Sequence, residues 1–121
     1  MQHDFERAIA RHLDWASQFR KAIDEQALTD AIERCAYDDL CDFGIWLYSL
    51  DDAVKFTPEF RAVKDLHYQF HLAASLVVAQ MKARHFEAAR QMVSGDFTAV
   101  SDRLVAAIRD WQAASLPAEA N

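Results

Sequence analysis

A chain of 121 residues, of which 52% are hydrophobic, is long enough to form one domain with its own core and without disulfide support. It has only two glycines and two prolines, which argues against a turn-rich β-sandwich or barrel and favours long helices joined by few connections. The net charge of −6, with no run rich in Lys and Arg, argues against nucleic acid or an anionic membrane as the main partner.

The sequence also bears on the cellular compartment. We find no signal-peptide pattern at the N-terminus and no stretch near the ~20 apolar residues that a membrane span requires. The two cysteines, Cys35 and Cys41, do not form a disulfide framework, and in a reducing compartment a cysteine is a thiol or a metal ligand. We therefore expect a cytoplasmic protein with a single domain over residues 1–121 and a frayed tail at 115–121.

The first predicted helix runs from Gln2 to about Glu25. At ~100° per residue, one narrow apolar face is made of Phe5, Ile9, His12, Ala16, Phe19 and Ile23. Charged residues occupy the opposite side. This pattern is typical of a bundle helix, and it places His12 in the middle of the apolar stripe.

Two short helices are predicted next. The stretch 26–40 has poor periodicity, but Thr29 followed by an acid is a plausible helix start. Asp38 and Asp39 are typical of the cap or first turn of a further short helix at about 40–50, which has the sequence LCDFGIWLYSL.

The second long helix has a clear start. Thr57 can cap it, Pro58 suits the first helical position and Glu59 follows, and the periodicity continues to about Arg84. Its main apolar stripe consists of Phe60, Val63, His67, His71, Ala74, Val78 and Met81. A second apolar patch lies on the other side and consists of Leu66, Leu72, Ala73 and Leu76. A helix that is apolar on two sides is buried twice or meets a partner chain.

The last long helix is predicted from Phe86 to Ala114. Apolar residues recur there at spacings of three and four, namely Phe86, Ala89, Val93, Phe97, Val100, Leu104, Ile108 and Trp111. Because this phase continues through Gly95, we expect one helix that tolerates the glycine at a cost of ~1 kcal/mol relative to alanine. The predicted fold is all-α, an antiparallel four-helix bundle with an additional short helix that carries Cys41.

Three histidines lie at the centres of the apolar stripes, and each neutral ring has polar nitrogens that need partners. His67 and His71 are four residues apart, so both rings lie on one helix face, one turn apart, as two ligands of one metal would. With His12 on another inward face, the bundle could offer three imidazoles. The alternative is that all three are core histidines with satisfied rings.

Cys41 can supply a fourth ligand. A thiolate with imidazoles and no carboxylate suits tetrahedral Zn²⁺. Gly44, three residues further on, would then remove a Cβ and let the short helix approach the histidines. Phe43 and Trp46 would pack around the site. The alternatives are that Cys41 is a small buried hydrophobe, as we expect for Cys35, and that Gly44 is only a packing glycine.

At these residues the sequence resembles the chemoreceptor zinc-binding domain family. The resemblance rests on three motifs: His12 with Trp15 three residues later, Cys-x-φ-Gly-x-Trp at residues 41–46, and His-x-x-x-His at residues 67–71. Four ligand positions match in type and order, and the resemblance extends from about residue 5 to 112.

The resemblance implies a cytoplasmic bacterial four-helix bundle that holds one Zn(II) per chain through His12, Cys41, His67 and His71. It implies a sensor of zinc availability or of hypochlorous acid, acting in chemotaxis or cyclic-di-GMP control. The implied partners are a second copy of the chain, a chemoreceptor or a diguanylate cyclase, with no nucleic acid and no membrane. The sequence contains no receptor coiled coil and no catalytic domain, so we expect either a free-standing member or a fragment excised from a longer protein.

Three other functions are alternatives for a chain of this kind. A di-iron bundle needs carboxylates beside the histidines, and none lies at the centre of the stripes. A helical adaptor or dimerisation protein, with zinc purely structural, is compatible with the two-sided helix. An enzyme is disfavoured because four protein ligands leave no position for a reacting water, and no phosphate loop or nucleophile elbow is present.

Overall fold

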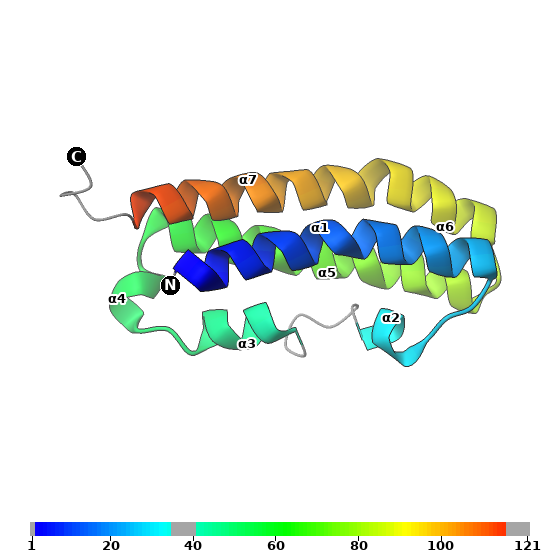
Figure 1. The fold of residues 1–121 in the computed structure, drawn as a ribbon, viewed down its shortest axis with the longest axis horizontal. Helices are drawn as coiled ribbons and strands as arrows, with labels where there is room; N and C mark the ends of the chain where they lie inside the picture. The colour runs from blue at the N-terminus through cyan, green and yellow to red at the C-terminus, as the bar shows by residue number, and fades with distance from the viewer. Residues whose placement is uncertain (1, 35–40, 116–121) are drawn as a thin grey trace.

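The computed structural model describes residues 2–34 and 41–115, and over these ranges it contains helices and no strand (Figure 1). The long elements are α1 (Gln2–Glu25), α5 (Pro58–Lys82) and a continuous rod made of α6 (Phe86–Met92), η2 (Val93–Phe97) and α7 (Thr98–Ala114). The predicted all-α class and the predicted positions of the three long elements are confirmed. Residues 35–40, which include Cys35, Asp38 and Asp39, and the expected tail beyond residue 115 lie outside the described residues.

Three short helices complete the bundle: α2 (Asp30–Arg34), α3 (Asp42–Tyr48) and α4 (Asp52–Lys55). In Figure 1, α1 and α5 run in the same direction and α7 runs against both, while the short helices form a row along one side. This row occupies the fourth side of the bundle. The predicted helices near Thr29 and Cys41 are α2 and α3, whereas α4 was not predicted.

The predicted helix starts depend on hydroxyl caps. The backbone N–H of Phe60 donates to Thr57 Oγ1 over 3.4 Å, and Pro58 occupies the first position of α5. At α2, the N–H of Ile32 donates to Thr29 Oγ1 over 3.3 Å. In each case the hydroxyl satisfies a donor that the helix itself leaves open. Thr29 and Thr57 therefore fix where the two helices begin.

One detail of the last helix differs from the prediction. The rod continues through Gly95 as expected, but residues 93–97 form a π-helical turn instead of an α-helical one, and Thr98 Oγ1 donates to the carbonyl of Val93 over 2.5 Å. Ala89, Val93 and Phe97 are all buried, and they follow one another in steps of four. The inner face therefore continues through the π turn, which takes up one extra residue within the helix.

The predicted apolar stripes of α1 and α5 face the core of the bundle. In α1 the side chains of Phe5, His12 and Phe19 are completely buried, and every residue of the main α5 stripe is buried. The second α5 patch is divided: Leu66 and Ala73 are partly buried against the core, whereas Leu72 and Leu76 remain 51% and 54% exposed. Burial on both sides of α5 within this chain is therefore wrong for Leu72 and Leu76.

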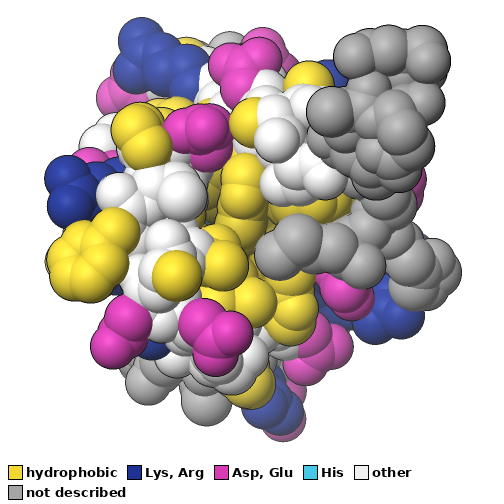
Figure 2. Space-filling model, turned by 90° about the vertical axis from the view of Figure 1, so that its left-hand side faces the viewer, with side chains coloured by type: hydrophobic (Ala, Val, Ile, Leu, Met, Phe, Trp, Pro, Cys, Tyr) yellow, Lys and Arg dark blue, Asp and Glu magenta, His cyan; other side chains and the backbone are white. Residues whose placement is uncertain are grey.

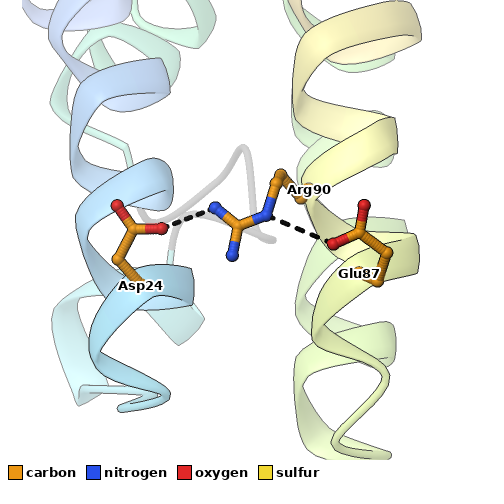
Figure 3. Close-up of polar contacts among 3 residues, drawn as sticks. All are labelled: Asp24, Glu87 and Arg90. Carbon is orange, nitrogen blue, oxygen red and sulfur yellow. Dashed lines mark hydrogen bonds and ion pairs between the residues drawn. The ribbon is translucent and has the colours of Figure 1, made fainter.

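The surface shows two further features. Figure 3 shows Arg90 of α6 between Asp24, at the end of α1, and Glu87 on its own helix, which ties the two rods together at one end. Figure 2 shows the opposite end, where hydrophobic side chains gather around a hollow. The groove at this end is lined in part by Val54, Trp111 and Ala114.

Candidate metal centre

His12 enters the core from the middle of α1, and its ring is 0% exposed. Its Nδ1 donates a hydrogen bond to the backbone carbonyl of Ala8 over 2.7 Å. Because this bond fixes the proton on Nδ1, the lone pair of a neutral ring lies on Nε2. That nitrogen faces Cys41 Sγ at 4.0 Å. A ligand histidine commonly has such a second hydrogen bond to hold its ring in place.

His67 and His71 enter from α5, one turn apart, and are 1% and 2% exposed. Their Nε2 atoms lie 3.0 Å from each other. The centre of the His12 ring lies 5.2 Å from that of His67 and 6.0 Å from that of His71. The prediction that these histidines share one face and meet His12 is therefore confirmed.

Cys41 is the cap residue of α3, with extended backbone (φ −82°, ψ 133°), and its side chain is half-buried. The backbone N–H groups of Phe43 and Gly44 bond to its sulfur. Donors at a helix start stabilise a thiolate. Gly44 is buried, and its backbone N–H is one of these two donors to the sulfur. The sequence did not indicate this role of Gly44 as a donor. Its predicted role in clearing space for the close approach stays a prediction.

The four ligand atoms, one each from His12, Cys41, His67 and His71, all lie within 4.8 Å of one another. For a tetrahedral zinc ion with Zn–N bonds near 2.05 Å and a Zn–S bond near 2.3 Å, neighbouring ligands lie roughly 3.3 Å (N to N) and 3.6 Å (N to S) apart. The observed 3.0 Å between the two α5 nitrogens and 4.0 Å between sulfur and nitrogen bracket these values. The donor set and its spacing fit zinc. The cluster contains no carboxylate, unlike the di-iron sites of bundles.

Burial sets the protonation of these groups. It lowers the pKa of His12 to about 4 and that of His67 to about 2, with repulsion from neighbouring rings as a smaller cause. Burial raises the pKa of the Cys41 thiol, although the N–H groups of Gly44 and Phe43 and the charge of Arg11 offset part of this effect. At neutral pH His12 and His67 are therefore neutral and ready to bind a metal, whereas Cys41 must first lose a proton.

Aromatic rings enclose the cluster. Phe43 of α3 lies 5.6 Å from the His12 ring and 5.3 Å from the His67 ring, and Phe70 of α5 lies 4.9 Å from His12, between ring centres. Phe43 thus lies against two candidate ligands, and Trp46 stacks on Phe43 at 5.6 Å between ring centres. Phe70 was missed, although its position next to His71 in an apolar helix could have indicated it.

Trp46 packs α3 against the long helices of the bundle. Its ring meets Phe5 of α1 and Trp111 of α7 at 6.0 Å and 5.6 Å between centres. Trp15, the other predicted supporting residue, is 8% exposed and lines a cavity together with Cys41 and His71. Through Trp46, the helix that follows Cys41 thus contacts both the first helix and the last helix of the chain.

The sequence matches the family described as the chemoreceptor zinc-binding domain over residues 12–78, more than half of the chain. The chain belongs to this family. The matched region includes all four candidate ligands, and it is shorter than the 5–112 over which the resemblance was traced. No curated protein and no solved structure matches the chain. Among the helices that the structure describes, none has the length and apolar character to cross a membrane.

Proposed function

We propose that this chemoreceptor zinc-binding domain, as one unit over residues 1–121, holds one Zn(II) per chain in a closed site made by His12, Cys41, His67 and His71. The observation that carries this proposal is the convergence of their four ligand atoms within 4.8 Å. Bound zinc would cross-link α1, α3 and α5 and keep the Cys41 sulfur as a thiolate. Four protein ligands leave no open position for a reacting water, so the proposed role is regulatory and not catalytic.

The segment that bears Cys41 is proposed to respond to the signal. The three histidines lie on long helices and are at most 2% exposed, whereas Cys41 is half-buried at the start of a helix of seven residues. A chelator or an oxidant reaches the cysteine more easily than the histidines. Loss of the sulfur as a ligand would release α3, and Trp46 would carry this change to Phe5 and Trp111.

Both signals implied by the family can act through this sulfur. Low zinc would empty the site. Hypochlorous acid would transfer chlorine to the thiolate sulfur and release hydroxide, and hydrolysis of the sulfenyl chloride would give the sulfenic acid, hydrogen chloride being lost. Either event removes the Cys41 thiolate from the donor set. We propose that the response serves bacterial signalling in the cytoplasm, in chemotaxis or cyclic-di-GMP control.

Cobalt substitution tests the ligand set. Co²⁺ in a tetrahedral site with one thiolate gives intense visible d–d bands and a sulfur-to-metal charge-transfer band in the near ultraviolet. We expect both in the wild type at one equivalent of Co²⁺. Cys41→Ser should lose the charge-transfer band, and His71→Ala should bind the metal far more weakly. A charge-transfer band that survives Cys41→Ser would contradict the assignment.

A partner surface is proposed on the outer face of α5. Tyr68, Leu72 and Leu76 follow one another at intervals of four and are 54%, 51% and 54% exposed. Such a stripe suits a second copy of the chain or a signalling protein such as a chemoreceptor or a diguanylate cyclase. The second candidate function, a dimerisation adaptor with structural zinc, uses the same surface. Molar mass measured by light scattering, with and without chelator, separates the two, because an adaptor's dimer would ignore zinc removal.

A further inference from the structure

The π turn in the last rod places one aromatic side chain in the core of the bundle. The turn covers residues 93–97, and its first and last residues, Val93 and Phe97, are 0% and 1% exposed. Residues 94–96 between them are exposed, and a Cβ added at Gly95 would meet nothing within 4 Å. A π turn holds one residue more than an α-helical turn, and such turns are frequent at functional sites. Here the inner side of the turn contributes Phe97.

Phe97 connects the rod to the two long helices that carry the histidines. Its ring centre lies 5.1 Å from that of Phe19 on α1 and 4.9 Å from that of Phe70 on α5. All three rings are at most 1% exposed. Because a close-packed interior has few voids, a displacement of one of these rings is passed on to its neighbours.

Phe70 continues this contact to two candidate ligands. Its ring centre lies 4.9 Å from that of His12 and 5.1 Å from that of His71, with interplanar angles of 73° and 90°. Edge-to-face contacts of this kind have a preferred geometry, so they favour one orientation of each imidazole. A single ring of α5 thus touches ligands from two helices, and Phe97 contacts that ring from the third long element.

The orientation of His71 matters because its Nε2 lies only 3.0 Å from the Nε2 of His67. When both nitrogens direct a lone pair to one metal ion, they are two acceptors that repel each other until a cation lies between them. Packing around the rings must therefore help to hold the nitrogens at this spacing. Loss of the support around metal ligands commonly lowers metal affinity by roughly 10–100-fold.

We propose that Phe97, placed by the π turn, is a positioning residue for the metal centre and supports two of its imidazoles through Phe70. This inference rests on the proposed function, because it concerns the affinity of the same site for zinc. The four candidate ligands belong to α1, α5 and the start of α3. The rod of α6, η2 and α7 acts on them from behind, through two buried aromatic rings.

Deletion of Gly95 tests the role of the π turn. Removal of one residue from its exposed side lets an α-helix continue with the flanking faces unchanged, but it moves Phe97 relative to Phe70. We expect about tenfold weaker Zn²⁺ binding in a competition titration against a chromophoric chelator, in buffer where circular dichroism shows the metal-free chain to be folded. Gly95→Ala keeps the length of the chain and is the matched control, with the affinity of the wild type.

Co²⁺ distinguishes positioning from a general loss of stability. In the deletion variant the visible d–d bands, which report the arrangement of all four ligands, should shift. The sulfur-to-metal charge-transfer band should remain, because Cys41 is held by the start of α3. A merely structural role would lower the urea midpoint of the metal-free protein and leave the d–d bands of the folded, cobalt-loaded protein where they are.

A second pair of variants tests the ring itself. Phe97→Leu and Phe60→Leu each remove a buried phenylalanine ring, 1% and 3% exposed, but Phe60 packs on Trp111 near the start of α5. Both substitutions should lower the urea midpoint of the metal-free protein. Only Phe97→Leu should weaken zinc binding, again by about tenfold, and shift the cobalt bands.

Zinc affinity equal to that of the wild type after deletion of Gly95 would overturn the role of the π turn. Wild-type affinity in Phe97→Leu, or an equal loss in Phe60→Leu, would overturn the role of the ring. If the deletion variant fails to fold, the two phenylalanine variants decide the proposal by themselves. A wild-type chain that binds neither Zn²⁺ nor Co²⁺ is a different result: it contradicts the proposed function and this inference with it.

Discussion

The buried histidines predict that the metal-free protein loses stability as the pH falls from about 6.5 towards 4. His12 has an ordinary pKa of 6.5 when the chain is unfolded and a pKa of about 4 when it is folded. Below pH 6.5 the unfolded chain therefore binds a proton that the folded chain refuses. Linkage requires the free energy of unfolding to decrease over this window and to level off, for this residue, below pH 4.

The magnitude follows from the two pKa values. One pKa unit corresponds to about 1.4 kcal/mol, so His12 alone removes about 1.4 kcal/mol at pH 5.5 and about 3 kcal/mol below pH 4. His67 acts in the same direction, because its pKa is also lowered, to about 2. For a domain whose total stability is of the order of 5–15 kcal/mol, this is a large loss.

Urea unfolding followed by circular dichroism, with a chelator present at pH 7.5, 6.5 and 5.5, measures the effect. His12→Leu removes one titrating group, so its stability should decline less steeply, by about 1 kcal/mol over this range. Carboxylates titrate in both proteins and cancel in the comparison. Equal slopes in the wild type and His12→Leu would refute the reasoning.

Three other predictions follow from the structure. Zinc binding at pH 7.5 should release about one proton, from the Cys41 thiol, because His12 and His67 are already neutral; calorimetry in buffers of different ionisation enthalpy counts it. Gly95→Ala should raise the free energy of unfolding by up to about 1 kcal/mol, because an added Cβ would meet nothing within 4 Å, and a lower melting temperature would contradict this. Arg90→Ala should leave the midpoint of urea unfolding almost unchanged, since its ion pairs are exposed.

Most of the metal centre could be predicted because its signals are local. The four-residue interval between His67 and His71 fixes their common face, and the apolar stripe around His12 fixes its inward direction. Thr57 and Pro58 likewise mark a helix start through a hydrogen bond within one turn. Such features depend on a few neighbouring residues, so the sequence alone determines them.

The remaining features depend on tertiary packing. The steps of four from Ala89 to Phe97 also occur in buried α-helical stretches, such as Val63 to His71, so the pattern does not reveal the π turn. That Arg11 and Arg34 line the same cavity depends on how the chain turns after α1, where Gln26 adopts φ 51° without a glycine to mark it. A residue's helix face can be predicted, but what approaches that face from another element cannot.

The same limit applies to the fourth side of the bundle. The sequence predicted short helices near Thr29 and Cys41, but it did not indicate α4. Short helices have weak periodicity, and their positions depend on side chains such as Trp46 packing on Phe5 and Trp111.

The central claim is that His12, Cys41, His67 and His71 together hold one zinc ion. Elemental analysis of the purified chain, after dialysis against a weak competitor, tests it most directly. The account predicts one zinc per chain in the wild type and affinity lower by orders of magnitude in Cys41→Ala or His71→Ala. Stoichiometric zinc that survives replacement of all four residues would contradict it.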